Sequence, residues 1–249
     1  MRLSKLLAAA GVVVALVAGP AAKAAPTLAR PATGARPATG EEGRRLAELP
    51  LTVVPAVGSG DTLVVFYSGD GGWAKLDRSL ADGLVRAGLP VIGIDSLHYF
   101  WTERTPQGAA ADLSLVLRHY LAAFGKSRVV LVGYSFGADV LPAVVPHLPA
   151  DLRGRLRLVA LIGAETQGEL RFRPESWLGL AGATAYPMAP ALAQLKGVPM
   201  ICVYGSEDPK SACPTFPASV IRSVKVAGGH HYDGDYGVLS RAILDALPR

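Results

Sequence analysis

This chain of 249 residues contains little charge, few aromatic side chains and only two cysteines. Charged residues make up 18% of the sequence and aromatic residues 7%, whereas half of all residues are apolar. A disordered chain has the opposite balance, so the composition predicts a globular protein. Its length is sufficient for one ordinary domain with a full core.

Motifs for metals and nucleotides are also missing. The five histidines lack the paired His, Cys or carboxylate spacing of zinc sites, so we expect no metal. The run Gly69-Asp70-Gly71-Gly72 is not followed by Gly-Lys-Ser/Thr, which excludes a nucleotide-binding Walker loop. The sequence therefore predicts a protein without a cofactor.

The first 24 residues have the pattern of a secretory signal peptide. Arg2 and Lys5 form the charged start, residues 6–18 are apolar, and Ala22-Lys23-Ala24 is a small-x-small cleavage site. The apolar run is short for a bilayer span, so we favour cleavage after Ala24 over an uncleaved anchor. The mature protein is then expected in the periplasm or outside the cell.

Net charge gives no sign of a nucleic-acid partner. The whole chain has a formal charge of +5, and removal of the signal peptide with Arg2, Lys5 and Lys23 lowers it to +2. The sequence also has no basic stripe interleaved with aromatic residues. We therefore expect no binding of DNA or RNA.

Export affects the interpretation of the two cysteines. In an oxidising compartment, Cys202 and Cys213 are predicted to form a disulfide that ties a core strand to the loop behind it. The alternative is two separate buried thiols.

Residues 25–45 are predicted to be a flexible linker. They are rich in Pro, Ala, Thr and Gly, and the six residues 29–34 are repeated at 35–40. Such a segment cannot bury a core. The folded domain is expected to cover residues 46–249.

Within this domain, apolar runs typical of strands alternate with helical patterns. Strands are predicted at residues 51–57, 62–67, 89–94, 129–132, 156–162, 200–204 and 220–226. Helices are predicted at 74–87, 105–124, 136–148, 191–196 and 236–246, whereas 95–101 and 163–190 are expected to be irregular. Pro142 and Pro146 are expected to bend the third of these helices or to end it early. The first two strands are predicted to form a hairpin around residues 58–61.

The predicted strands are apolar throughout, which is typical of a mostly parallel sheet with helices on both faces. The fold class is therefore α/β. With right-handed crossovers after the first strands, an α/β-hydrolase fold without a large cap domain is the natural topology.

The chemistry is predicted to centre on Ser135. Residues Gly133-Tyr134-Ser135-Phe136-Gly137 follow an apolar strand and precede a helix. The two glycines permit a sharp turn that exposes the serine hydroxyl at the edge of the sheet. The alternative is a serine packed in an ordinary tight turn.

A serine hydroxyl needs a base, and the base needs an orienting carboxylate. In this type of sheet they follow in the order Ser, Asp/Glu, His, each after a strand. Asp208 is the predicted acid, with Glu207 beside it as the alternative. Either His230 or His231 is the base, and the sequence Gly229-His230 favours His230.

The oxyanion of a tetrahedral intermediate needs preorganised N–H donors. The predicted donors are the backbone N–H groups of Phe136, after the nucleophile, and of Asp70, in the glycine-rich turn after an early strand.

Four stretches together resemble the VirJ/AcvB family of exported bacterial proteins, which belongs to the α/β hydrolases. They are residues 67–73, residues 93–106, residues 133–142, and Gly229-His230-His231-Tyr232-Asp233-Gly234-Asp235-Tyr236. The resemblance implies a periplasmic serine hydrolase that removes lysine or alanine from aminoacylated phosphatidylglycerol, at the membrane surface. It also implies virulence functions and a periplasmic protein partner in secretion.

A cationic head group would require carboxylates near the mouth of the site. Asp95 and Asp139 are candidates for this role, and the aromatic side chains of Tyr99 and Trp101 either line the pocket or cover it. Two alternatives to the lipid substrate remain open. One is a general carboxylesterase or thioesterase, and the other is a non-catalytic periplasmic interaction protein.

Overall fold

The computed structural model describes residues 40–175 and 182–248. The predicted signal peptide and residues 25–39 of the predicted linker lie outside the described residues. The last residues assigned to the linker, 40–45, instead belong to helix α1 (Gly40–Glu48). Glu41 and Glu42 in its first turn favour a helix start, and Arg45 forms an ion pair with Asp112 of the domain.

A seven-stranded sheet forms the centre of the domain, in the order β1-β3-β2-β4-β5-β8-β9. All neighbouring strands are parallel except β1 and β3. The strands are β1 (Leu51–Val54), β2 (Thr62–Tyr67), β3 (Val91–Ile94), β4 (Arg128–Tyr134), β5 (Leu156–Ile162), β8 (Met200–Gly205) and β9 (Arg222–Val226). The predicted α/β class with a mostly parallel sheet is confirmed.

The predicted hairpin of the first two strands is wrong. Strand β1 pairs antiparallel with β3, from Leu51 opposite Ile94 to Val54 opposite Val91, and β2 lies on the far side of β3. Strand β2 is buried from its second residue onwards, so it needs partners on both edges, whereas β1 is partly exposed and suits the edge of the sheet.

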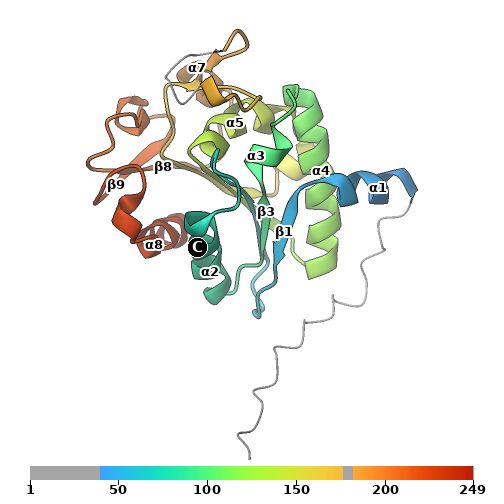
Figure 1. The fold of residues 1–249 in the computed structure, drawn as a ribbon. Coiled ribbons are helices and arrows are strands. Elements are labelled where there is room, and N and C mark those ends of the chain that lie inside the picture. The colour runs from blue at the N-terminus through green and yellow to red at the C-terminus, as the bar shows by residue number, and fades with distance from the viewer. Residues whose placement is uncertain (1–39, 176–181, 249) are drawn as a thin grey trace, which may run out of the picture. The chain divides into compact units, whose positions relative to one another are not determined.

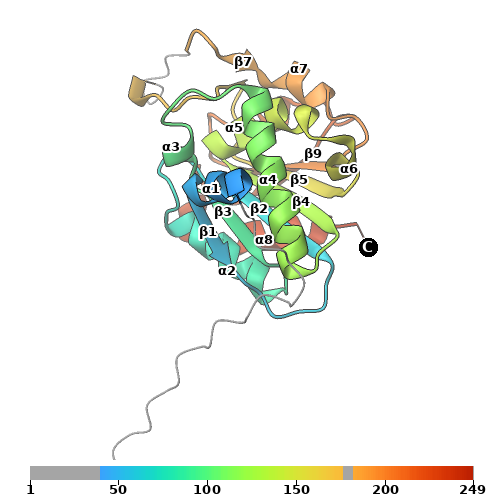
Figure 2. The same cartoon turned by 90° about the vertical axis from the view of Figure 1, so that its right-hand side faces the viewer.

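Helices cover both faces of the sheet (Figures 1 and 2). On one face, α4 (Pro106–Phe124) and α5 (Phe136–Val144) pack against alternate residues of β2, namely Leu63, Val65 and Tyr67. On the other face, α2 (Lys75–Arg86) and α8 (Gly237–Ala246) pack against Val64 and Phe66. The period of two along the strand thus divides the core into two layers.

Shorter elements lie in the connections. Helix α3 (Ser96–Tyr99) occupies part of a segment predicted to be irregular, and α6 (Ala150–Arg153) precedes β5. Between residues 163 and 190, β6 (Gln167–Gly168) and β7 (Tyr186–Pro187) form a small antiparallel pair, and α7 (Met188–Ala193) follows. In residues 40–175 and 182–248, no helix is both long enough and apolar enough to cross a bilayer.

Helix α5 ends early, as expected from its two prolines. It ends at Val144, and residues 145–147 continue as a 3-10 turn. Pro142 and Pro146 lack the N–H group that an α-helix would use at their positions, which explains the early end. The first residues of α5 follow β4 after a single residue, so the start of the helix lies at the carboxyl-terminal end of that strand.

Candidate active site

Ser135 lies in a strained turn between β4 and α5. Its φ is 49° and its ψ is −120°, and its backbone N–H donates to the carbonyl oxygen of Ile162 at 2.7 Å. A Cβ atom at Gly133 would lie 2.3 Å from the carbonyl oxygen of Gly137, and one at Gly137 would lie 2.2 Å from that of Tyr67. Both glycines are therefore required by close backbone contacts, as expected for a nucleophile elbow.

The hydroxyl of Ser135 is hydrogen-bonded to an imidazole. His230 Nε2 lies 2.9 Å from Ser135 Oγ, and His230 Nδ1 lies 2.7 Å from Asp208 Oδ2. The Asp208 side chain is 1% exposed and that of His230 is 25% exposed. This chain of contacts can draw the proton from the hydroxyl while the carboxylate orients the imidazole.

The loops that carry Asp208 and His230 are held together by backbone contacts. The N–H of Glu207 donates to the carbonyl oxygen of Gly228 at 2.9 Å. A Cβ atom at Gly205 would lie 2.3 Å from the carbonyl oxygens of both Gly228 and Gly229. The parallel pairing of β8 and β9 thus brings the two loops to the same sheet edge.

The alternatives named for the acid and the base occupy other positions. Glu207 is exposed, and Asp208, not Glu207, contacts the imidazole. His231 is also exposed, and its Nδ1 lies 3.0 Å from the Tyr134 hydroxyl. The structure therefore joins His230, and not His231, to Ser135.

The two predicted oxyanion donors lie on segments that touch each other. Phe136 is the first residue of α5, and the next residue, Gly137, lies against the backbone of Tyr67 and Ser68. Asp70 follows directly in the turn, whose ends are linked by the hydrogen bond from Gly72 N–H to the Gly69 carbonyl oxygen. This arrangement places the turn beside the Ser135 elbow.

Asp77 of α2 is buried near this turn. One carboxylate oxygen accepts the Ala74 N–H at 3.0 Å, and the other has no hydrogen-bond partner in the described part of the chain. Burial raises the pKa of Asp77 to about 6, although backbone N–H groups, those of Ala74 and Gly69 among them, act to lower it. The burial of Asp77 could not be predicted, because a carboxylate in the first helical turn is common on protein surfaces.

Three of the four predicted substrate-binding residues have structural partners. Asp95 caps α3 and pairs with His98 at 2.8 Å. Tyr99 is buried, and its hydroxyl donates to Asp112 at 2.7 Å. Asp139 is 7% exposed, and its carboxylate accepts the backbone N–H of Glu165. Each of these three side chains thus has a hydrogen-bond or ion-pair partner within the protein itself.

Trp101 is the fourth, and it is 64% exposed. Its ring stacks on Phe172, which also contacts Phe136 edge-on, and Phe136 contacts Phe100 in the same way. Phe100, Phe136 and Phe172 thus form an aromatic cluster, and one of its members, Phe136, directly follows Ser135 in the sequence. Phe172 was not predicted as part of the site, because residues 163–190 were expected to be irregular.

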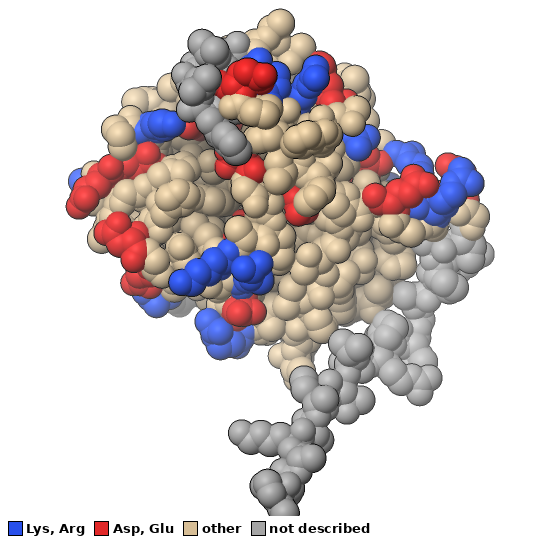
Figure 3. Space-filling model, in the orientation of Figure 1, with Lys and Arg blue, Asp and Glu red and all other residues tan. Residues whose placement is uncertain are grey.

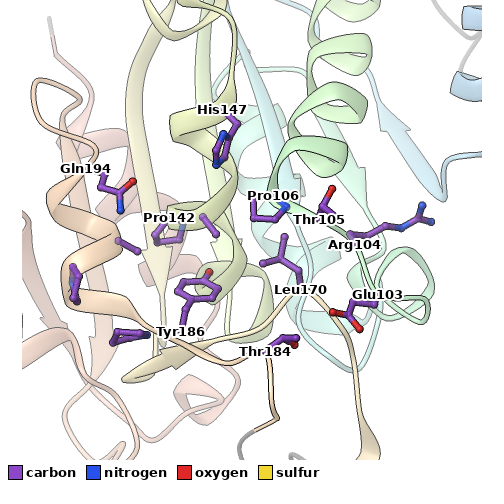
Figure 4. A pocket seen from close by; sticks show the side chains of 14 residues that line it. Glu103, Arg104, Thr105, Pro106, Pro142, His147, Leu170, Thr184, Tyr186 and Gln194 are labelled. Carbon is purple, nitrogen blue, oxygen red and sulfur yellow. The ribbon is translucent and has the colours of Figure 1, made fainter.

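A pocket of about 480 Å³ lies along α5, beyond its first two turns (Figure 4). It is bounded by the start of α4, the second half of α5, and the segment from β7 to α7. The labelled side chains that line it are Glu103, Arg104, Thr105, Pro106, Pro142, His147, Leu170, Thr184, Tyr186 and Gln194. Its walls combine apolar rings with a few polar groups, as ligand pockets do.

The predicted disulfide is present, since Cys202 of β8 is bonded to Cys213. Among residues 40–175 and 182–248, no group of three or more His, Cys, Asp or Glu side chains is placed to hold a metal ion. On the face shown in Figure 3, basic and acidic side chains are interspersed.

A known bacterial family matches most of this sequence. The family described as "Bacterial virulence protein (VirJ)" matches residues 61–249. The chain belongs to the VirJ family. This confirms the resemblance found in the sequence, and the matched residues include Ser135, Asp208 and His230. No curated protein matches this VirJ-family chain.

Solved structures with a similar fold are distant in sequence. Est1E from Butyrivibrio proteoclasticus is 14% identical with a TM-score of 0.57, over 79% of this chain and 93% of its own. MenH from S. aureus is 13% identical with a TM-score of 0.59, over 79% and 97%. A lipase-esterase related protein from Clostridium acetobutylicum ATCC 824 is 11% identical with a TM-score of 0.57, over 80% and 99%. The VirJ-family chain thus has the α/β-hydrolase fold.

Proposed function

We propose that this VirJ-family protein is an exported serine hydrolase that cleaves an ester, with aminoacylated phosphatidylglycerol as its substrate. The observation that supports hydrolysis is the contact of Ser135 Oγ with His230 Nε2 at 2.9 Å, with Asp208 at 2.7 Å from the other ring nitrogen. Similar folds in an esterase-related protein and in Est1E agree with this chemistry.

In the first half of the reaction, Ser135 Oγ attacks the ester carbonyl carbon and its proton moves to His230 Nε2. Asp208 stabilises the imidazolium that forms, because its carboxylate accepts the Nδ1–H. The N–H groups of Phe136 and Asp70 are proposed to donate to the oxyanion. His230 then returns the proton to the leaving alcohol, and the acyl group remains on Ser135.

In the second half, a water molecule takes the place of the alcohol. His230 accepts a proton from the water as the oxygen attacks the acyl-enzyme, and the proton returns to Ser135 Oγ when the bond breaks. The products are the free acid and an alcohol. With an aminoacyl phospholipid they are an amino acid and phosphatidylglycerol.

Support for the aminoacyl lipid comes from family membership and from side chains near the site. An aminoacyl ester carries an ammonium group, and the half-buried Asp70 lies on the turn beside Ser135. Glu103 lines the pocket along α5, and Arg171 lies 3.9 Å from its carboxylate. We propose these two carboxylates, in addition to Asp95 and Asp139, as candidates for binding the ammonium group.

Export is proposed from the signal-peptide pattern of residues 1–24, and the Cys202–Cys213 disulfide agrees with an oxidising compartment. The substrate would then be met at the outer side of the cytoplasmic membrane. A protein partner in secretion, as the family resemblance implies, is part of the same proposal.

The test is hydrolysis of purified lysyl- and alanyl-phosphatidylglycerol by the wild type and by Ser135→Ala. We expect the wild type to release the amino acid and the variant to lose at least about 10³-fold in kcat. A short-chain nitrophenyl ester serves as the control substrate. Turnover of the control ester alone would identify a general esterase instead of a lipid hydrolase.

A fluorophosphonate probe separates an enzyme from a binding protein. We expect the native wild type to be labelled at Ser135 and Ser135→Ala to remain unlabelled, since the probe requires an activated hydroxyl. Native protein that is neither labelled nor active on any ester would refute the hydrolase and leave the interaction protein.

A further inference from the structure

Tyr134 contacts three segments of the candidate site at once. It is the last residue of β4 and directly precedes Ser135. Its hydroxyl lies 3.3 Å from the backbone carbonyl oxygen of His230 and 3.0 Å from His231 Nδ1. Its ring contacts the glycine-rich turn, because a Cβ atom at Gly69 would lie 3.0 Å from Tyr134 Cδ1.

The ring of Tyr134 also confines the imidazole of His230. The two ring centroids are 5.5 Å apart with an interplanar angle of 32°. The same imidazole touches Gly163 after β5, where a Cβ atom would lie 2.9 Å from His230 Cε1. The imidazole therefore has little freedom to turn away from Ser135 and Asp208.

The Tyr134 hydroxyl can satisfy both of its neighbours only with one proton arrangement. The side chain is 6% exposed, and burial raises the pKa of Tyr134, so the hydroxyl keeps its proton. A hydroxyl donates one hydrogen bond and accepts up to two. It can donate to the His230 carbonyl oxygen while it accepts from His231 Nδ1–H, and this pair of bonds fixes the backbone at His230.

We infer that Tyr134 is a positioning residue for the hydrolysis, an inference that rests on the proposed function. It does not touch the reacting atoms. Its hydroxyl holds the His230 backbone, and its ring separates the His230 imidazole from the Gly69 turn. His230 Nε2 is thereby kept within hydrogen-bond distance of Ser135 Oγ, and small errors in such a geometry are costly to the rate.

The test is Tyr134→Phe, which keeps the ring and removes the hydroxyl. We expect kcat for the control ester to fall about tenfold while KM stays within about twofold, since positioning acts on the chemical step. Tyr232→Phe is the matched control. Tyr232 is also buried beside His230, but its hydroxyl has no hydrogen-bond partner among the described residues, so its kcat should remain that of the wild type.

A second pair of variants tests the same hydrogen bond from the exposed side. His231→Ala removes the donor to the Tyr134 hydroxyl, whereas His231→Asn can place an amide N–H near the position of Nδ1. We expect kcat to fall about fivefold in His231→Ala and to recover in His231→Asn. Equal rates in both variants and the wild type would overturn the role of this bond.

A measurement without substrate keeps the inference separate from the proposed function. The low-field proton NMR signal of His230 Nδ1–H, which donates to Asp208, should broaden in Tyr134→Phe through faster exchange with water, but not in Tyr232→Phe. An unchanged signal together with an unchanged kcat would overturn the inference. A wild type that hydrolyses no ester would instead refute the proposed function, and the signal would still decide whether Tyr134 positions the imidazole.

Discussion

Cys202 and Cys213 are joined by a disulfide that closes the segment containing Asp208. Cys202 is in β8 and pairs with neighbours on both sides in the sheet, so it is a fixed anchor. At the other end, the N–H of Ala212 donates to the carbonyl oxygen of Ala164 at 2.8 Å. The disulfide thus holds both ends of the Asp208 loop against the strands from which the site is built.

Removal of this disulfide is predicted to lower both stability and activity. The Cys202→Ser/Cys213→Ser variant should lose about 2–4 kcal/mol of unfolding free energy, because the unfolded chain is no longer closed into a loop. We also expect a lower kcat, since the Asp208 loop loses one anchor. Urea unfolding and ester hydrolysis measure the two effects. Identical denaturation midpoints with and without reductant would contradict this prediction.

The two adjacent histidines are predicted to differ strongly. His230→Ala removes the group that contacts both Ser135 and Asp208, so kcat should fall by at least about 10³-fold. His231→Ala should retain activity within about tenfold, because His231 acts only through Tyr134. Both variants should show the wild-type unfolding midpoint. Similar rates for the two variants would remove the assignment of His230 as the base.

Gly137→Ala is predicted to disturb the turn at Ser135 and the neighbouring glycine-rich turn at residues 68–72 together. The added Cβ would lie 2.2 Å from the Tyr67 carbonyl oxygen, so the backbone must move. We expect a loss of about 1–3 kcal/mol in unfolding free energy and a large fall in kcat. Gly60→Ala is the control, because a Cβ there has no neighbour within 4 Å. A fully active Gly137→Ala protein would show that the turn is not needed in this position.

Asp77 predicts a specific pH dependence of stability. Its pKa is raised from 3.8 to about 6 in the folded state, so the folded protein holds this proton more tightly than the unfolded chain. Its contribution to stability is therefore full below pH 3.8 and is lost as the pH rises through about 6. The difference in unfolding free energy between Asp77→Asn and the wild type should therefore shift in favour of the variant by up to about 3 kcal/mol between pH 4 and pH 8.

Urea unfolding at both pH values measures this gain. Asp82→Asn, which alters an exposed carboxyl group on the same helix, is the control. A constant difference between Asp77→Asn and the wild type across the pH range would disprove the raised pKa.

The central strands and the order of the chemical groups could be predicted from the sequence. The bounds of β2 and β5 agree with the prediction, because both are continuous apolar runs with clear ends. Ser135, Asp208 and His230 were candidates because each follows such a run. Parallel strands bring their carboxyl ends to one edge, so strand positions alone were enough to predict that these three groups would meet.

Features that depend on tertiary contacts could not be predicted. Strand β1 was predicted to pair with β2 in a hairpin. In the sheet, β2 instead lies between β3 and β4, and β1 pairs with β3 at the edge. Helix α1 is held by the pairing of Arg45 with Asp112, which is 67 residues away. Tyr99 and Asp139 were predicted to bind substrate, and their hydrogen bonds to Asp112 and to the backbone of Glu165 could not be foreseen because the partners are distant in sequence.

The order of the three groups along the chain also sets the moment at which they meet. Ser135 is synthesised first, Asp208 later and His230 last of the three. In a chain that folds from its amino end, the hydroxyl is in place while the imidazole has yet to arrive. A serine without its base is a weak nucleophile, so under the proposed function a growing chain gains its activated hydroxyl only when β9 joins the sheet.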